Sequence, residues 1–467
     1  MKITIVGAAG GEVTGSAYYV QTRSASVLVD CGLFQGGKKA EALNRPPTGP
    51  RQKLDAVLLT HGHLDHTGRL PLLTQRGHRP AVFATPATID MAALILRDSA
   101  RIQASEAERQ NRKRERAGQP PIQPLYSPQH AEEIIQCLQP VPYGEPVRVA
   151  EGIQARFLEA GHMLGSASIQ LMVHDEGRVK KVVFSGDLGP KGSPILRNFD
   201  QLDGADLVFL ESTYGDHDHR PFPQTVEEFV SIVKDAVARK GKILIPTFAV
   251  GRAQMLTVLM SWMFRKKHAK LFPLFLDSPM AIEATKLYYK HFRDNPELFD
   301  DRLLNYIRQK PIRDDLKTLK ATATAEQSKQ INDCPGPCLV MAGAGMCNAG
   351  RILHHLKANL WRPETHVIIV GYQAHGSLGR RLIEGEKVVS IHGDKIAVKA
   401  KIHTLGGFSA HAGQTDLLAW FNGLAAAKPR VVLTHGEDGP REVLAKLIWE
   451  KYHLKPVIPQ MQETIVF

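Results

Sequence analysis

The stretch LTHGHLDHTG, Leu59 to Gly68, places three histidines and one aspartate within six residues. These four side chains are His61, His63, Asp65 and His66. The segment before them, LDAVLL at 54–59, is short, apolar and rich in valine and leucine, which predicts a buried strand. We therefore expect the polar cluster to occupy a loop at the end of that strand.

The residue types in this cluster favour metal binding. Imidazole and carboxylate groups are the usual ligands of zinc, and His61 and His63, two residues apart on an extended loop, can point toward one ion. Asp65 and His66 follow on a turn and fit a second ion nearby. The alternative interpretation is a solvated, histidine-rich loop without a metal.

The length and the termini of the chain set limits on its class. A chain of 467 residues exceeds the size at which a single core stops growing, so two domains are expected. The N-terminus, MKITIVGAAGG, does not have the pattern of a signal peptide, and no apolar run is long enough for a membrane helix. Five scattered cysteines favour a reducing compartment, so we expect a cytoplasmic protein without membrane association.

The charge balance favours a polyanionic partner. Lysine and arginine number 59 against 47 aspartates and glutamates, which gives a net charge of +12. The clearest basic block runs from Arg97 to Arg116, with seven basic and four acidic residues. Two interpretations of this block stay open, a solvated helix face and an arm that contacts phosphates.

Three more segments repeat the pattern of an apolar strand followed by a small or polar residue and a candidate ligand. They are FLEAGHMLGSAS at 157–168, VVFSGDLG at 182–189 and PRVVLTHGE at 429–437. They add His162, Asp187 and His435 to the candidate ligands. Together with the first cluster, these residues complete two coordination spheres.

We assign the candidate ligands to two zinc ions per chain. His61, His63 and His162 would bind one ion, Asp65, His66 and His435 the other, and Asp187 would bridge them. A hydroxide shared by two ions about 4 Å apart is suited to attack a phosphodiester. Asp30, at the end of the strand ASVLVD, is expected to accept a hydrogen bond from a ligand and orient it, with a strand-end turn residue as the alternative.

The order of HGHLDH, GH, GD and a late histidine resembles the metallo-β-lactamase superfamily of dinuclear hydrolases. Later segments are similar to those of its β-CASP branch, whose members cleave nucleic acids. These segments are LVFLESTYGD, ILIPTFAVGRAQ, GAGMCNAGR, GYQAHGSLGR, FSAHAGQTD and VVLTHGE. The likeness is closest to RNA-processing members, among them the endonuclease subunit of the eukaryotic cleavage and polyadenylation machinery and compact prokaryotic relatives.

The resemblance implies an α/β fold in which an αββα metallo-β-lactamase sandwich carries an inserted α/β β-CASP domain. The sandwich would comprise residues 1–214 and 400–467, the insertion residues 215–399, and the active site would lie in the cleft between them. The sequence agrees with an α/β insertion. Its strand-like segments are KILIPTF, KLFPLFLD, CLVMAG and THVIIVG.

The resemblance also carries residue roles. Glu211 in LESTYG, His411 in FSAHAG and His435 in THGE match motifs A, B and C of the branch. Because the metal positions are already filled, we interpret His411 as the general acid and Glu211 as the carboxylate that orients it, and Asp65 joins them in the catalytic set. Glycine-flanked turns and arginines predict phosphate contacts, at Ser377, Arg380, Gly345 and Arg351.

The expected function is that of a zinc-dependent ribonuclease in RNA processing or decay. It would act as an endonuclease, with 5′-to-3′ exonuclease activity as a further expectation, on single-stranded RNA, and leave 5′-phosphate and 3′-hydroxyl ends. A homodimer is expected, and no nucleotide cofactor, because GAAGGEVTG does not satisfy G-x-G-x-x-G. The alternatives are a DNA nuclease of the same branch, a thioester or lactone hydrolase, and a noncatalytic RNA-binding scaffold. RNA is favoured over DNA because DNA-processing members tend to carry an apolar residue at motif C, where this chain has His435.

Overall fold

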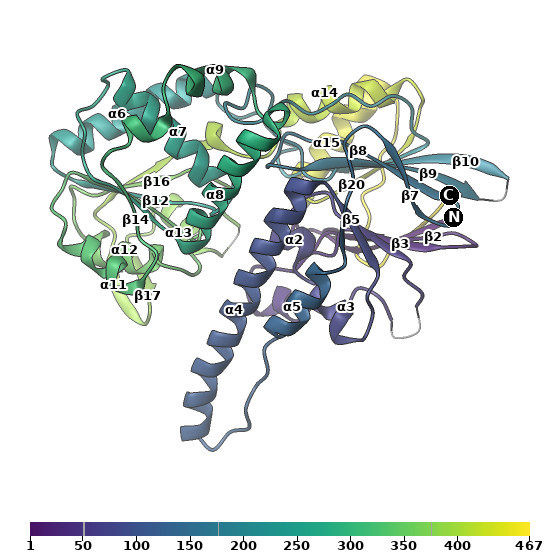
Figure 1. The fold of residues 1–467 in the computed structure, drawn as a ribbon, viewed down its shortest axis with the longest axis horizontal. Coiled ribbons are helices and arrows are strands. Elements are labelled where there is room, and N and C mark those ends of the chain that lie inside the picture. Colours follow the sequence, from purple (N-terminus) through teal and green to yellow (C-terminus); the bar gives the residue numbers. More distant parts are fainter. Residues whose placement is uncertain (50–51, 176, 375) are drawn as a thin grey trace. The chain divides into compact units, whose positions relative to one another are not determined.

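The computed structural model describes residues 1–49, 52–175, 177–374 and 376–467. The chain divides into two units (Figure 1). Unit 1 comprises Met1–Lys191, Asn198–Asp218 and His411–Phe467, and unit 2 comprises Gly192–Arg197 and His219–Ala410. The second unit is therefore inserted into the first along the chain.

The first sheet of unit 1 has the strand order β21-β1-β2-β3-β4-β5-β6. Its strands are β1 (Lys2–Gly7), β2 (Ala17–Gln21), β3 (Ser26–Val29), β4 (Ala56–Leu58), β5 (Ala81–Ala84), β6 (Leu138–Pro140) and β21 (Thr464–Val466). Strands β3 to β6 run parallel, so their carboxyl ends meet at one edge of the sheet. The segment predicted as a strand at 54–59 contains β4.

The second sheet of unit 1 has the order β20-β11-β10-β9-β8-β7. Its strands are β7 (Pro146–Ala150), β8 (Ile153–Glu159), β9 (Ala167–Asp175), β10 (Arg178–Phe184), β11 (Leu207–Glu211) and β20 (Arg430–Thr434). Strands β10, β11 and β20 are parallel, which gathers three carboxyl ends from distant parts of the sequence.

The two sheets share one apolar core. The rings of Phe184 and Phe209, on neighbouring strands of the second sheet, stack with centroids 4.8 Å apart. Tyr18, from the first sheet, lies 5.1 Å from each of them. Buried side chains of both sheets join this cluster, so the sheets pack face to face.

Helices cover the outer face of each sheet. Leu73 of α3 (Pro71–Gln75), Leu96 of α4 (Pro86–Arg116) and Ile134 of α5 (Pro128–Ile135) pack on the first sheet. Trp420 of α14 (Gln414–Ala425) and Leu444 of α15 (Asp438–Tyr452) pack on the second. Two short helices, α1 (Lys38–Glu41) and α2 (Leu64–Thr67), complete the unit. This is the predicted αββα sandwich.

Helix α4 extends past its neighbours in unit 1 (Figure 1). It begins at the hydroxyl of Thr85, which accepts a hydrogen bond from the Thr88 amide over 3.2 Å. The last of its buried residues is Ala107, so the remaining turns are mostly exposed. Within the described residues, no helix combines the length and apolarity needed to cross a membrane.

Unit 2 is built on a parallel sheet with the order β14-β13-β15-β12-β16-β19. Its strands are β12 (Lys242–Pro246), β13 (Leu274–Asp277), β14 (Leu319–Ala321), β15 (Cys338–Ala342), β16 (His366–Ile369) and β19 (Lys401–Thr404). A separate hairpin joins β17 (Val388–Ile391) to β18 (Asp394–Ala397). The predicted strands of the insertion thus lie side by side, as expected of an α/β insertion.

Helices and 3-10 turns connect these strands. They are α6 (Phe222–Ala238), α7 (Arg252–Arg265), α8 (Pro279–Asp294), η1 (Pro296–Leu298), α9 (Asp301–Gln309), α10 (Ile312–Asp315), α11 (Ala325–Gln330), η2 (Ile331–Asp333), α12 (Ile352–Asn359), α13 (Leu378–Ile383) and η3 (Gly406–Phe408). Ile352 and Leu356 of α12 pack with Leu382 of α13 against one face of the sheet. Helix α6 contacts β12 and α8 contacts β13.

The unit boundaries differ from the predicted ones at 214/215 and 399/400. Residues 401–404 form β19, which pairs in parallel with β16, so the chain stays in unit 2 until Ala410. Asp218 accepts a hydrogen bond from the amide of Thr415 over 2.7 Å, which keeps the chain in unit 1 as far as that aspartate. Strand pairing decides one unit boundary and a local hydrogen bond decides the other. Neither boundary can be predicted from the local composition of the sequence.

A second difference is the short segment Gly192–Arg197, which belongs to unit 2 although it was expected in the sandwich. Its Ile195 carbonyl accepts the amide of Asp300 over 2.9 Å, and Leu196 forms an antiparallel bridge with Phe299. These contacts join residues about 100 positions apart in the sequence.

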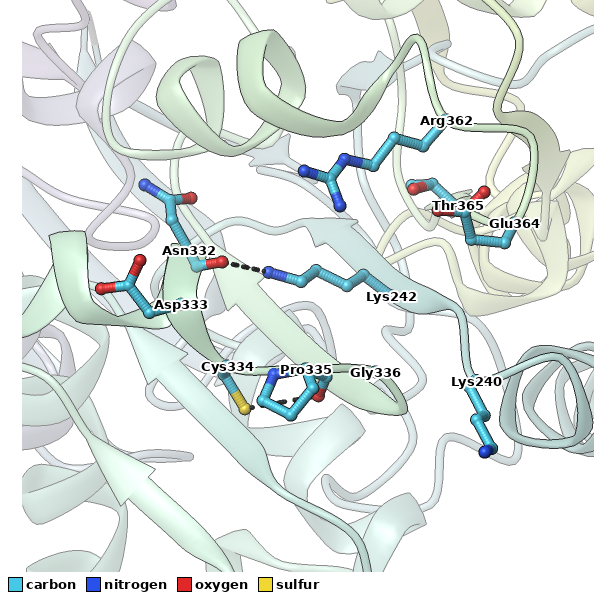
Figure 2. A pocket seen from close by; sticks show the side chains of 10 residues that line it. All are labelled: Lys240, Lys242, Asn332, Asp333, Cys334, Pro335, Gly336, Arg362, Glu364 and Thr365. Carbon is cyan, nitrogen blue, oxygen red and sulfur yellow. Dashed lines mark hydrogen bonds between the residues drawn. The ribbon is translucent and has the colours of Figure 1, made fainter.

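The amino edge of the unit 2 sheet carries a polar cavity of about 250 Å³ (Figure 2). The Lys242 ammonium donates to the carbonyl oxygens of Ile331 and Asn332 over 3.1 and 2.9 Å, and the guanidinium of Arg362 points into the same space. The polar lining agrees with a solvated space at the strand starts.

Candidate metal centre and active site

The candidate site of unit 1 forms where strands of both sheets end. Asp30 follows β3, His61 follows β4, His162 follows β8, Asp187 follows β10 and His435 follows β20. Glu211 is the last residue of β11. Each strand therefore delivers one polar side chain at its carboxyl end, which is how the fold gathers groups that are up to about 400 positions apart in the sequence.

Two of these residues adopt the left-handed backbone conformation. Asp30 has a φ of 57° and His435 a φ of 52°, which residues other than glycine adopt rarely. The His435 amide donates to the Ala8 carbonyl over 2.8 Å, which stabilises this conformation. Such strained positions concentrate at functional sites, where surrounding contacts maintain them.

Three histidines converge at one side of the site. Nδ1 of His63 lies 3.1 Å from Nε2 of His61 and 3.1 Å from Nε2 of His162. A tetrahedral zinc ion with bonds of about 2.0 Å separates its nitrogen ligands by about 3.3 Å. The spacing is therefore that of donors around one small cation.

A second group lies on the other side of Asp187. Nε2 of His66 and Nε2 of His435 are 3.1 Å apart, and Oδ2 of Asp65 lies 3.7 Å from the latter. Asp65 and His66 belong to helix α2, which begins at Leu64, so the turn predicted here is a short helix. The structure thus brings together the two ligand groups that the sequence assigned to separate ions.

Asp187 lies between the two groups with one oxygen toward each. Oδ2 is 3.4 Å from Nε2 of His61 and 3.6 Å from Nε2 of His162. Oδ1 is 3.2 Å from Nε2 of His66 and 3.5 Å from Nε2 of His435. The carboxylate is 2% exposed. Each carboxylate oxygen is therefore within reach of a cation that the neighbouring group of side chains would hold.

The nitrogen and oxygen atoms that face one another in this site fit the binding of a metal ion better than they fit hydrogen bonding among themselves. A neutral ring nitrogen either donates or accepts, so Nδ1 of His63 cannot satisfy two facing nitrogens with one proton. Oδ1 of Asp187 is buried and receives no hydrogen bond from the residues that the structure describes. Buried polar atoms without partners are costly, and a bound cation would compensate both features.

Neighbouring side chains orient the histidine rings. Oδ2 of Asp30 lies 2.7 Å from Nδ1 of His66, which is the contact expected of a residue that positions a ligand. The Thr60 hydroxyl donates to Asp30 over 2.8 Å and also lies 3.1 Å from Nδ1 of His61. These contacts leave Nε2 of both rings free to face the centre of the site.

Threonines are the part of the site that the sequence interpretation missed. Besides Thr60, the Thr213 hydroxyl lies 3.2 Å from Nδ1 of His435. Both threonines stand in motifs that were already quoted, LTHGH and ESTYG. The available signal was a hydroxyl next to a predicted ligand, but threonine is also common at strand ends for structural reasons.

Burial favours the neutral form of two of the candidate ligands, His61 and His63, and neutral imidazole is the form that binds a metal. Desolvation lowers the pKa of His63 to about 4 and lowers the pKa of His61 well below its usual range, with the nearby charge of His66 acting in the same direction. Both rings are therefore neutral near pH 7 and have a lone pair available for a cation.

His411 and Glu211 form a pair beside this centre. Nδ1 of His411 lies 3.3 Å from Oε1 of Glu211, and its Nε2 lies 3.9 Å from Oδ2 of Asp187. Glu211 is buried and accepts amide hydrogen bonds from Leu188 and Thr213 over 2.8 and 3.1 Å. Backbone amides therefore hold the carboxylate in place beside the histidine.

The protonation of His411 differs from that of His61 and His63. Burial lowers its pKa, but the charge of Glu211 and the hydrogen bond to it, together with the charges of Asp187 and Asp65, raise the pKa to about 8. The imidazolium is thus favoured near neutral pH. Because Nδ1–H of the imidazolium donates its hydrogen bond to Glu211, the other proton is on Nε2, the atom that faces Asp187.

The residues predicted to contact phosphates lie in unit 2. Arg351 donates to Asp277 over 2.7 Å and to the carbonyls of Thr322 and Ala323. The Ser377 hydroxyl accepts the amide of Arg380 and begins helix α13. These are scaffold contacts, and the phosphate contacts of Gly345 and of these residues remain predictions.

The basic segment of helix α4 has two parts. Arg97, Arg101 and Arg109 pair with acidic side chains at 2.8 Å or less. Arg112, Lys113 and Arg116, on the last two turns, are exposed and form no ion pair within the described residues. Only this terminal part has charges available for a polyanion.

Sequence models of three known domains match the chain in order. They are a beta-lactamase superfamily domain at residues 25–245, a Beta-Casp domain at 253–382, and a Zn-dependent metallo-hydrolase RNA specificity domain at 395–459. The first contains most of the metal-facing residues, and the last contains His411 and His435. The predicted resemblance is confirmed in this respect.

Relatives of known name cover nearly the whole chain. Ribonuclease TTHA0252 of Thermus thermophilus is 41% identical over 96% of both chains. An RNase J-like protein of Methanocaldococcus jannaschii is 29% identical over 95% of this chain and 94% of its own. The transcription termination factor FttA of Methanosarcina mazei is 29% identical over 97% of this chain and 70% of its own length.

A solved structure supports the fold. A protein of unknown function from Enterococcus faecalis V583 aligns with a TM-score of 0.55 at 12% identity, over 100% of this chain and 99% of that one. This likeness concerns the fold alone. The identity to the Thermus ribonuclease over almost the full length, together with the three matching domains, shows that the chain belongs to the β-CASP family of the metallo-β-lactamase superfamily.

Proposed function

We propose that this protein is a zinc-dependent ribonuclease that hydrolyses phosphodiester bonds of single-stranded RNA. The observation that carries the proposal is Asp187, whose two carboxylate oxygens face two separate ligand groups. A hydrolase of small thioesters or lactones does not require the basic surface of this chain, whose net charge is +12. The names of its relatives include a ribonuclease and an RNase J-like protein, and the domain that contains His411 is described as an RNA specificity domain.

The ligands would hold two ions. His61, His63 and His162 would bind one, Asp65, His66 and His435 the other, and Asp187 would contact both. Bound there, the ions would lower the pKa of a water molecule and offset charge on the phosphate oxygens. Both tasks suit a phosphodiester, which is a poor electrophile because it is already negatively charged.

The chain itself supplies the proton for the leaving group. As the water oxygen adds to phosphorus and releases one proton to the solvent, the bond from phosphorus to the 3′ oxygen breaks, and Nε2 of His411 donates its proton to that oxygen. The imidazole then regains a proton from the solvent. Glu211 stabilises the imidazolium beforehand and keeps its Nδ1 directed away from the reaction. The products are a 3′-hydroxyl and a 5′-phosphate end.

The substrate class can be tested directly. Purified protein loaded with zinc is incubated with single-stranded RNA and DNA of one sequence, end-labelled, with the 5′ end either blocked or free. We expect internal cleavage of RNA, with 5′-phosphate ends that a ligase accepts. Equal cleavage of the DNA would favour the DNA nuclease, and hydrolysis of thioesters or lactones without RNA cleavage would favour the small-molecule hydrolase.

Metal content is the second prediction. Elemental analysis of metal-loaded protein is expected to give about two zinc ions per chain, since the seven ligands form two groups. His435→Ala should lose or weaken one ion, whereas His217→Ala, which alters a side chain 56% exposed in a loop, should retain both. Fully loaded wild-type protein with a single ion per chain would contradict the bridging role of Asp187.

The third prediction separates proton donation from metal binding. His411→Ala should retain both zinc ions and bind RNA, but cleave it about 10² to 10⁴ times more slowly, the usual contribution of a positioned acid. A diester with a 4-nitrophenol leaving group departs without protonation, so the variant should hydrolyse it almost as fast as wild type.

Glu211→Gln should follow the same pattern with a smaller effect, because the charge that favours the imidazolium is removed while the side chain retains its shape. Loss of zinc in His411→Ala, or an equal loss of rate on both substrates, would show that this histidine is a ligand or a packing residue instead.

The fourth prediction concerns the two interpretations of helix α4. RNA affinity should fall with salt, and each phosphate contact contributes a slope of about 0.7 in log affinity against log salt. Replacing Arg112, Lys113 and Arg116 with alanine should make the slope less negative by up to about 2. The control Arg101→Ala removes a cation that Asp98 already neutralises and should change the slope little. An unchanged slope in the triple variant would identify a solvated helix face.

A further inference from the structure

Phe248 is the exposed residue of an otherwise buried loop in unit 2. It follows β12 by two residues, and 36% of its side chain is exposed, whereas Ala249 and Val250 are buried. The side-chain amide of Gln254 anchors the loop. Its Nε2 donates to the Ala249 carbonyl over 3.1 Å, and its Oε1 accepts a hydrogen bond from the Gly251 backbone amide over 2.7 Å. Single exposed aromatic side chains are common, so exposure alone carries little weight.

The surroundings of the ring are more specific than its exposure. A β-carbon at Gly345 would lie 2.6 Å from carbon atoms of the Phe248 ring, and one at Gly371 would lie 3.0 Å away. The contact at Gly345 is too short for a side chain unless the ring moves, and the contact at Gly371 would be tight. Glycine at both positions lets the ring lie directly against the backbone. One side of the ring is thereby supported, and 36% of the side chain is exposed.

A buried glutamine links the two glycine segments. Nε2 of Gln373 donates to the Gly345 carbonyl over 2.9 Å and to the Gly371 carbonyl over 3.1 Å. Gln373 is only 4% exposed. The two loops that support the ring are therefore joined by one amide group, which fixes the position of Phe248.

The ring also lies at the position where open parallel sheets bind ligands. Strands β12 and β15 are neighbours, but the chain continues from β12 toward β13 on one side and from β15 toward β16 on the other. Connections that leave in opposite directions create a topological switch point at the carboxyl edge. Phe248 follows β12, and Gly345 follows β15 at the same edge.

An exposed, rigid aromatic ring offers a flat apolar surface to a flat partner. Nucleobases stack on such rings regardless of their identity, and the gain is sequence-tolerant because every base has a π face. The net positive charge of the chain, +12, would attract the phosphates of such a ligand.

We infer that Phe248 is a stacking platform for one base of the single-stranded RNA substrate. This inference rests on the proposed ribonuclease function and assigns to unit 2 a contact with a base, in addition to the phosphate contacts predicted there. The platform requires both supporting glycines and the Gln373 link.

The test measures kcat and KM of zinc-loaded variants on a labelled single-stranded RNA. Phe248→Ala is expected to raise KM by about 5- to 100-fold, the size of one lost base stack, with little change in kcat. Phe248→Trp retains an aromatic face and should remain close to wild type. Tyr289→Ala, which removes another aromatic side chain of unit 2 that is 50% exposed, is the matched control and should have no effect.

A series of RNAs with one abasic site at successive positions identifies the stacked base. With the wild-type enzyme, an abasic site at one position should lower kcat/KM by about the factor that Phe248→Ala causes. With the Phe248→Ala enzyme, an abasic site at that position should lower kcat/KM little further. That dependence separates stacking from a general structural effect.

Three outcomes would overturn the platform. The first is a Phe248→Ala enzyme that equals wild type, and the second is a loss confined to kcat. The third is a loss from Phe248→Ala that multiplies with the loss from the abasic site at every position tested. In each case RNA cleavage by the wild type would leave the ribonuclease proposal intact. A wild-type protein that cleaves no RNA would reject both proposals.

Discussion

The carboxylate of Asp187 lies between the two groups of candidate ligands in unit 1, and the rest of the site is arranged around its charge. A buried carboxylate is unfavourable unless cations or hydrogen bonds compensate it. Here one oxygen faces His61 and His162 and the other faces His66 and His435, all between 3.2 and 3.6 Å. Because each oxygen faces its own group of candidate ligands, this one side chain joins the two groups and fixes their spacing.

The αββα sandwich makes this arrangement possible by stacking two sheets whose strands end at the same place. The apolar core between the sheets, with Phe184 and Phe209 in contact with Tyr18, sets the distance between strand ends. The loops then need only one or two residues to reach the site. Hydrogen bonds from outside the ligand groups, such as that between Asp30 and His66, orient the rings, so the geometry is rigid before any substrate arrives.

Much of the fold and of the candidate site could be predicted from the sequence, because both are encoded in short patterns. Each apolar run that ends in a polar residue predicts a strand and the residue at its end, which is how His162, Asp187 and His435 were identified. The αββα sandwich with an α/β insertion was expected from the resemblance of these motifs to the β-CASP branch of the metallo-β-lactamase superfamily. The unit boundaries did not follow, because the pairing of β19 with β16 depends on residues more than 30 positions apart.

What the sequence by itself determined is the set of candidate ligands, since residue type and spacing along the chain suffice to single them out. The class of fold was expected from the resemblance of these motifs to a known superfamily. The tertiary structure alone decided which groups face one another. The contact of Thr60 with Asp30, the 3.3 Å approach of His411 to Glu211, and the support of Phe248 by two glycines all join separate segments. Such contacts depend on how sheets and loops pack in three dimensions, and side-chain packing is a property of the folded chain that no local pattern contains.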